Sequence, residues 1–142
     1  WTDFVGDEYK AFSGTAVYTT TINKVPVADV IKLNLGTVAE NASVYLNGEY
    51  IGTVIDSPYQ LYIPAEKFKG QDELVVRVAN SMANRIAYMD KKGVDWKIFY
   101  NVNMSARKKE NVKNGIFDAS DWEPKSSGLL GPVTLTPAMV KQ

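Results

Sequence analysis

Three polar residues follow the most regular β pattern of the chain and could bind a hydroxylated or acidic ligand. Asn80, Asn84 and Arg85 lie in "ANSMANRI", at the end of the alternating run "ELVVRVAN". Side-chain amides donate and accept hydrogen bonds, and a guanidinium pairs with carboxylates, so these groups could hold sugar hydroxyls or a uronic acid. The structural alternative is that the asparagines cap turns and Arg85 pairs with a neighbouring acid. The residue types leave both interpretations open.

Aromatic residues in the polar C-terminal half form a second candidate group. Trp96, Tyr100 and Trp122 could present flat rings that stack on the apolar face of a pyranose. Core packing, or contact with another domain, is the alternative for the two tryptophans, and packing is favoured for Phe99, whose ring has no polar group. The predicted carbohydrate-binding residues are therefore Asn80, Asn84, Arg85, Trp96, Tyr100 and Trp122.

Acidic residues in the same stretch raise the question of catalysis or metal binding. They are Asp90, Asp95, Asp118, Asp121 and Glu123. A glycosidase needs two carboxyl groups ~5–10 Å apart across the sugar, one of them protonated, whereas acids in a polar loop are more often solvated. Calcium prefers about six to eight oxygen ligands, to which Asp118 and Asp121 could contribute, but no EF-hand spacing is present. We predict no catalytic residue, no metal ligand and no cofactor, with a structural calcium ion as the open alternative.

The composition removes several other chemistries. The 142 residues include no cysteine and no histidine, which excludes disulfides, thiolate zinc sites and catalytic triads of the Ser-His-Asp or Cys-His kind. Sixteen basic and sixteen acidic residues balance, so no net field attracts nucleic acid or an anionic membrane. The basic run "ARKKENVK" lacks the interleaved aromatics of a nucleic-acid site; it either contacts an acidic polysaccharide or is a solvated loop. No apolar run reaches the ~20 residues of a membrane helix. We expect neither nucleic acid nor membrane insertion.

The segments that must position these residues are predicted to be short β-strands. Alternating or β-branched patterns cover Gly14–Ile22, Val30–Gly36 and Glu73–Asn80. Asn47-Gly48, inside "SVYLNGEYIGT", predicts a hairpin with a type I′ turn, because both residues readily take positive φ. On that hairpin Val44, Leu46 and Ile51 are expected to share the buried face.

Further strands are predicted at "SPYQLYIP", at Trp96–Val102 and at Gly128–Pro137, and "PAEKF" could form one helical turn. No amphipathic helix of about ten residues is apparent. About seven or eight short strands separated by turn signals indicate an all-β fold, an antiparallel β-sandwich with long loops in the C-terminal half. We expect residues 1–142 to form a single sandwich domain that is a fragment of something longer.

The ordered set of motifs resembles a known module. "LNLGTVAENASVYLNGEYIGTVIDSPYQLYIP", "KGQDELVVRVANSMANRI" and "SGLLGPVTL" are similar to the jelly-roll, galactose-binding-domain-like module of large bacterial glycoside hydrolases, of the family 2 sugar-binding type that also occurs in some α-L-rhamnosidases. The resemblance covers roughly residues 12 to 136 and includes Asn80 and Asn84. It does not extend to the loop from Tyr88 to Lys125.

The resemblance implies a non-catalytic module of a secreted or periplasmic bacterial enzyme that degrades polysaccharides. Its expected partners are carbohydrate and the other domains of the parent chain. Two alternatives remain: a structural module that docks on a catalytic domain without binding sugar, and a carboxylate-dependent glycosidase in its own right.

Overall fold

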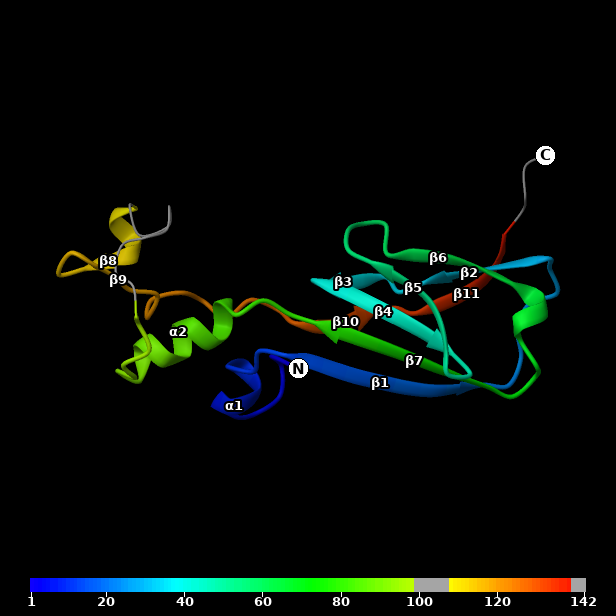
Figure 1. The fold of residues 1–142 in the computed structure, drawn as a ribbon, viewed down its shortest axis with the longest axis horizontal. Helices are drawn as coiled ribbons and strands as arrows, with labels where there is room; N and C mark the ends of the chain where they lie inside the picture. The colour runs from blue at the N-terminus through cyan, green and yellow to red at the C-terminus, as the bar shows by residue number, and fades with distance from the viewer. Residues whose placement is uncertain (99–107, 139–142) are drawn as a thin grey trace. The chain divides into compact units, whose positions relative to one another are not determined.

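The computed structural model describes residues 1–98 and 108–138 and divides the chain into two compact units (Figure 1). The first, which we call the small unit, consists of Trp1–Ser13 and Ser81–Ser126. The second, the sandwich unit, consists of Gly14–Asn80 and Ser127–Gln142. Each unit is described by itself.

The sandwich unit is built from antiparallel sheets, as the alternating patterns predict. One sheet has the order β1 (Thr15–Ile22), β7 (Asp72–Ala79), β4 (Asn41–Leu46) and β5 (Glu49–Val54). The second has the order β11 (Thr134–Ala138), β2 (Val30–Asn34) and β6 (Gln60–Pro64), and β10 (Gly128–Gly131) pairs with β3 (Thr37–Ala39). Figure 1 shows the sheets lying one over the other. The predicted all-β, antiparallel sandwich class is confirmed.

Alternate residues of these strands form the main core. Ile31, Leu33, Val44 and Val78 are completely buried, and Ile63 from β6 is nearly so. Because successive side chains of a strand point to opposite faces, the residues between them face outward. Removing these apolar surfaces from water is the main force that holds the two sheets together.

The predicted hairpin joins β4 to β5, but its register differs in one detail. Asn47 and Gly48 have φ angles of 52° and 80°, which confirms the type I′ prediction. Val44 stands opposite Gly52 and Tyr45 opposite Tyr50, so Ile51 is the extra residue of a β-bulge. Val44 and Leu46 are buried as expected, whereas Ile51 is only half-buried.

The C-terminal strand prediction also needs correction. Gly128–Pro137 is not one strand but two, β10 paired with β3 and β11 paired with β2. Gly131 has a φ of 69°, and Pro132 has no amide hydrogen to give to a ladder, so pairing cannot continue through this point. The predicted helical turn in "PAEKF" is a 3₁₀ turn at Ala65–Lys67.

The small unit contains the short helix α1 (Asp7–Lys10), the helix α2 (Ala83–Lys91), a 3₁₀ turn at Lys109–Asn111 and the two-stranded pair β8 (Val112–Lys113) and β9 (Ile116–Phe117). The sequence reasoning missed α2 and treated its residues as loop. Gly93, with a φ of 67°, ends the helix: its amide bonds the carbonyl of Asp90 and the next amide bonds that of Met89, a Schellman motif.

The strand predicted at Trp96–Val102 is not observed in its first three residues, and the rest of it lies outside the described ranges. None of the helices within residues 1–98 and 108–138 is long and apolar enough to span a membrane.

Candidate functional site

The two predicted asparagines make hydrogen bonds near the points where the chain leaves and re-enters the sandwich. Asn80 accepts a hydrogen bond from the Gly14 amide at 2.9 Å and donates to Ser127 Oγ at 3.3 Å. Asn84, in the first turn of α2, is 6% exposed. Its Nδ2 donates to the carbonyl of Lys125 and its Oδ1 accepts from the amide of the same residue, both at 2.8 Å. These contacts favour the structural interpretation, in which the asparagines fix loops.

The two predicted tryptophans pack in a second hydrophobic cluster, which belongs to the small unit. Phe117 and Ala119 are buried at its centre, and Trp96 and Trp122 pack around them together with apolar residues of α2. The ring of Trp122 meets that of Phe117 edge to face, with centroids 5.8 Å apart. Both indoles therefore contribute to packing.

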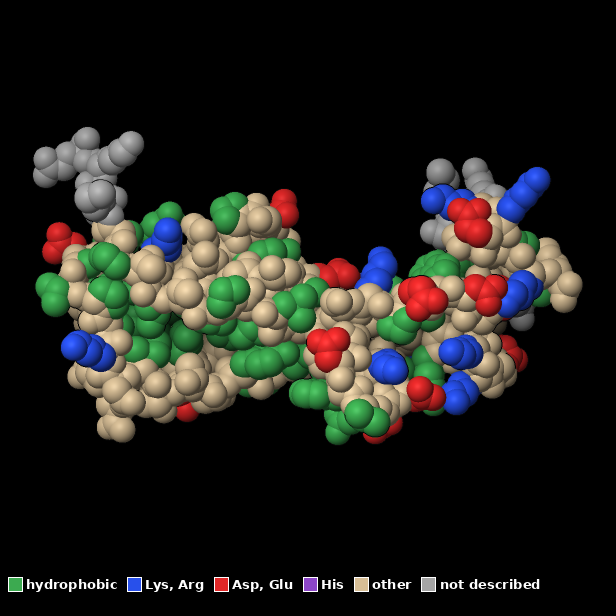
Figure 2. Space-filling view, turned by 180° about the vertical axis from the view of Figure 1, so that it is seen from behind, with side chains coloured by type: hydrophobic (Ala, Val, Ile, Leu, Met, Phe, Trp, Pro, Cys, Tyr) green, Lys and Arg blue, Asp and Glu red, His purple; other side chains and the backbone are tan. Residues whose placement is uncertain are grey.

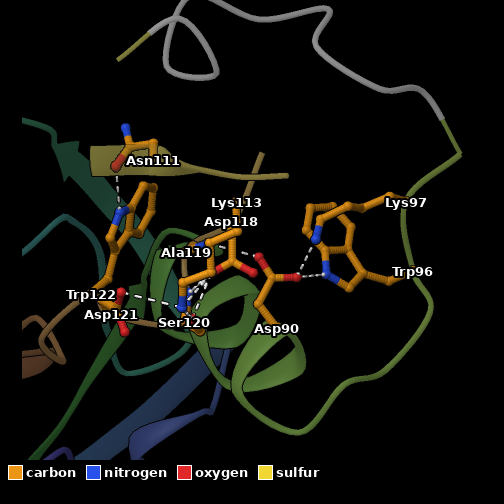
Figure 3. A network of polar contacts seen from close by, with 10 residues as sticks. All are labelled: Asp90, Trp96, Lys97, Asn111, Lys113, Asp118, Ala119, Ser120, Asp121 and Trp122. Carbon is orange, nitrogen blue, oxygen red and sulfur yellow. Dashed lines mark hydrogen bonds and ion pairs between the residues drawn. The ribbon is translucent and has the colours of Figure 1, made fainter. Parts of the chain in front are cut away.

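A buried carboxylate ties this cluster together (Figure 3). Asp90 accepts hydrogen bonds from Trp96 Nε1 at 2.7 Å and from the Ala119 amide at 2.8 Å, and it pairs with Lys97 Nζ at 2.7 Å. The Asp90 side chain is 1% exposed. A buried charge is tolerated when it is paired and hydrogen-bonded, and Asp90 meets both conditions. Its carboxylate is engaged in holding the structure.

A second group of acids surrounds Lys113 (Figure 3). Lys113 Nζ lies 3.2 Å from Asp121 and 3.4 Å from Asp118. The hydrogen bond to Asp121 raises the pKa of Lys113. Hydrogen bonds from the hydroxyl and amide of Ser120, together with Lys113, outweigh partial burial and lower the pKa of Asp118. Asp118 is thus held ionised, the opposite of what a general acid requires.

The surface of the small unit has a hollow of about 670 Å³, within the usual range of ligand sites. Tyr88 and Trp122 supply aromatic surface, Lys10 and Lys91 supply ammonium groups, and Asn84 lies at the same wall. A smaller hollow of about 380 Å³ also includes Asn84 and Trp122 among its lining residues. Of the predicted stacking residues that the structure describes, Trp122 lines both hollows.

Charges of both signs line the larger hollow. Asp7 pairs with Lys92 at 3.3 Å, and Asp121 pairs with Lys113. Within the described ranges, the ammonium groups of Lys10 and Lys91 have no ion-pair partner. On the face seen in Figure 2, basic and acidic side chains are interspersed over the small unit, whereas few charges mark the sandwich unit. The hollow therefore combines aromatic rings with polar groups suited to a hydroxylated or acidic ligand.

The other predicted residues lie apart from this arrangement. Arg85 is exposed on α2, with its guanidinium carbon 5.8 Å from the centre of the Tyr88 ring. Trp96 is not among the residues that line either hollow. Tyr100 and Phe99 lie outside the described residues. Among the described residues no three acidic side chains gather in a way that could hold a metal ion.

Sequence reasoning missed Lys10, Tyr88 and Lys91. Tyr88 is four residues after Asn84, so the two would fall on one face of a helix, and recognising α2 would have placed them together. The signal was the Lys-Lys-Gly sequence at residues 91–93, which is typical of a helix C-terminus. No local sequence pattern indicates that Lys10 lies at the hollow.

Comparison with known proteins finds relatives much longer than this chain. No family model matches. The chain is 32% identical over 150 residues to a "Putative beta-glucuronidase" of Formosa agariphila, covering 95% of this chain and 13% of that protein. It is similar in structure to a rhamnosidase from Novosphingobium sp. PP1Y, with a TM-score of 0.73 and 29% identity over 94% of this chain and 12% of that one. Nearly all of this chain is therefore similar to one small part of larger glycoside hydrolases, as the resemblance predicted.

Proposed function

We propose that this chain is a non-catalytic carbohydrate-binding module of a larger glycoside hydrolase. The observation that carries the proposal is the match of 94–95% of the chain to only 12–13% of the two relatives. Such a length fits one accessory domain rather than a complete catalytic apparatus. We include in the proposal the jelly-roll, galactose-binding-domain-like type of sandwich and a secreted or periplasmic location.

The hydrogen bonds and ion pairs of the carboxylates support a non-catalytic role. Asp90 is buried among three donors, and Asp118 and Asp121 share Lys113. A glycosidase needs one carboxyl group that keeps its proton near neutral pH, and the lowered pKa of Asp118 works against that.

The hollow of the small unit supports carbohydrate binding. Trp122 and Tyr88 offer ring surface, and the Trp122 indole is oriented by a hydrogen bond from its Nε1 to Asn111 Oδ1 at 2.9 Å. Lys10 and Lys91 can donate to hydroxyl or carboxylate oxygens at the same hollow. Sugar sites need this combination of apolar ring faces and a few placed polar groups.

The test is a calorimetric binding screen of the chain against neutral and acidic polysaccharides. We expect Trp122→Ala to weaken binding at least about tenfold, which corresponds to ~1.4 kcal/mol. Trp96→Ala is the matched control, because Trp96 packs in the same cluster but does not line the hollow.

Thermal melting of both variants separates lost binding from lost folding. Tyr88→Ala is a second variant of a residue that lines the larger hollow. Equal binding by the parent chain and by folded Trp122→Ala and Tyr88→Ala would refute the hollow as the site.

A structural docking module is the second candidate, and one observation favours it. The N-terminal segment of the small unit exposes Phe4 (60%), Val5 (96%), Tyr9 and Phe12. Exposed apolar patches on a soluble fragment commonly mark interfaces between domains. Under this candidate, Val5→Asp reduces association of the chain with the remainder of its parent enzyme in a pull-down. If the folded chain binds none of the glycans, the docking module becomes the favoured function.

A further inference from the structure

The outer face of the four-stranded sheet carries an ordered group of side chains that the hollow does not use. Val44, Val76 and Val78 point into the core, so the residues that alternate with them face outward. Ser43 and Tyr45 on β4 and Arg77 on β7 are among these outward residues, and Ser43 stands directly opposite Arg77. Two neighbouring strands, β4 and β7, thus present side chains at one exposed surface.

An aromatic and cationic row crosses these strands. Tyr45 and Tyr50 form a cross-strand pair, with ring centroids 5.5 Å apart. The guanidinium carbon of Arg77 lies 4.8 Å from the centre of the Tyr45 ring, a cation–π contact that fixes its position. We call Tyr45, Tyr50 and Arg77 the outer-face row. It spans β7, β4 and β5, which corresponds to ~10 Å at the usual strand spacing.

Hydroxyl groups flank the row. Tyr50 Oη lies 2.9 Å from Thr53 Oγ1, and Ser43 Oγ lies 2.7 Å from the same oxygen. The bond to Thr53 holds the Tyr50 side chain, and Tyr50 remains 55% exposed. A ring held in place but open to solvent loses little conformational entropy when a ligand stacks on it.

The Arg77 guanidinium is available to a ligand. In residues 1–98 and 108–138 it has no hydrogen-bond or ion-pair partner, and its contact with the Tyr45 ring uses none of its N–H groups in a hydrogen bond or ion pair, so these donors remain for a ligand. Its cross-strand neighbours Val17 and Ser43 are uncharged. The acid on the same face of β7, Glu73, is four residues away, about 13 Å along the strand. Arg77 is therefore a cation without a local counter-charge.

We propose that the outer-face row binds an anionic saccharide. A pyranose ring stacks on the exposed Tyr50, and the planar guanidinium of Arg77 donates paired hydrogen bonds to a carboxylate or sulfate of the sugar. Ser43 and Thr53 accept or donate to its hydroxyls. This site lies in the sandwich unit and shares no residue with the hollow. If it binds as proposed, the chain binds acidic glycans more tightly than neutral ones.

The experiment measures affinities of the complete chain by calorimetry for three oligosaccharides of equal length: an oligogalacturonate, a sulfated oligosaccharide and a neutral one. The parent chain is expected to bind at least one acidic probe about tenfold more tightly than the neutral one. Arg77→Gln is expected to abolish this preference and Arg77→Lys to keep part of it, because lysine retains the charge but not the paired geometry. Tyr50→Ala is expected to weaken binding of the preferred acidic probe.

Matched controls come from the outer face of the second sheet. Lys32 and Tyr62 stand opposite each other on β2 and β6, and Tyr62 is 62% exposed. Lys32→Gln removes one positive charge and Tyr62→Ala one exposed ring, without touching the outer-face row. Both variants are expected to bind like the parent chain, and melting curves confirm that every variant is folded.

The outcomes are distinct. A preference for the uronate identifies a carboxylate as the recognised anion, and a preference for the sulfated probe identifies a sulfate. Equal affinities for acidic and neutral probes, or an effect of Lys32→Gln as large as that of Arg77→Gln, would overturn the proposal. Acidic-probe binding that is lost in Trp122→Ala but kept in Arg77→Gln would support the hollow and reject the outer-face row.

Discussion

At the scale of single residues, Asp72 shows how a buried charge can hold a turn. It is 1% exposed and accepts hydrogen bonds from Asn47 Nδ2 at 2.6 Å and from the amides of Lys69 and Gly70 at 2.8 and 3.0 Å. Asn47 in turn accepts from the Glu73 amide. One carboxylate therefore connects the β4–β5 turn to the start of β7.

This arrangement predicts a pH-dependent stability. Burial raises the pKa of Asp72, but the hydrogen bonds from Asn47, Lys69 and Gly70 outweigh it, so the folded pKa lies below the ordinary value of 3.8. The contribution is complete above about pH 4 and is lost as the pH falls through the folded pKa. Asp72→Asn is expected to cost about 1–3 kcal/mol at pH 7 and to flatten the acid limb of the unfolding free energy.

Denaturant titrations of parent and variant between neutral pH and about pH 2.5 measure this effect. Asp29→Asn, at an exposed acid of the same unit, is the control and should reproduce the parent curve. If Asp72→Asn and the parent chain kept a constant difference in unfolding free energy over the whole range, the linkage would be wrong.

At the scale of elements, local chemistry determines what the sequence can predict. Alternation along β2, β4 and β7 predicts their faces correctly, because each buries one side in the main core. The bulge at Ile51 depends on how β4 and β5 pair, and a single-strand pattern does not contain that information. Helix α2 was missed because its few apolar residues face only a small cluster. Similarly, Trp122 could be predicted as a binding residue because it is aromatic. Lys10 could not be predicted, because only tertiary packing brings it to the hollow.

The hairpin element carries a direct test. Gly48 has a φ of 80°, and a Cβ there would meet no neighbouring atom, so any cost of substitution is conformational. Gly48→Val is expected to cost about 1–2 kcal/mol or more, since β-branched residues disfavour positive φ. Gly48→Asn is the control and should cost less, because asparagine tolerates this region. A thermal melt that leaves Gly48→Val indistinguishable from the parent would contradict the observed turn.

At the scale of the whole molecule, residues 1–98 and 108–138 bury apolar side chains within each of the two units. Ile31, Leu33, Val44 and Val78 belong to the sandwich unit, and Phe117 and Ala119 centre the cluster of the small unit. Charged residues are denser in the small unit than in the sandwich unit. Among the residues that the structure describes, the small unit buries fewer apolar side chains than the sandwich unit, so we expect the small unit to be the less stable of the two.

Hydrogen exchange can resolve this difference. Phe117→Ala removes the central ring of the small cluster and is expected to speed amide exchange in α2 and in residues 112–117, with a local cost of about 3–5 kcal/mol. Amides of β2, β4 and β7 should keep their protection. Val78→Ala is the reciprocal control, and faster exchange in β7 after Phe117→Ala would show that the two clusters unfold as one.

The asparagine contacts at the two ends of the segment 81–126 have a consequence for sequence variation. Asn84 grips both main-chain groups of Lys125 across 41 positions of sequence, and Asn80 contacts Ser127 across 47. These hydrogen bonds join the two ends of a long segment, as the closing base pairs of a nucleic-acid hairpin join the ends of its loop. Lengthening a closed loop is inexpensive, about 0.6 kcal/mol for each doubling. We therefore expect related proteins to keep the same β-sandwich while the segment between these asparagine contacts varies in length and in the ligand it binds.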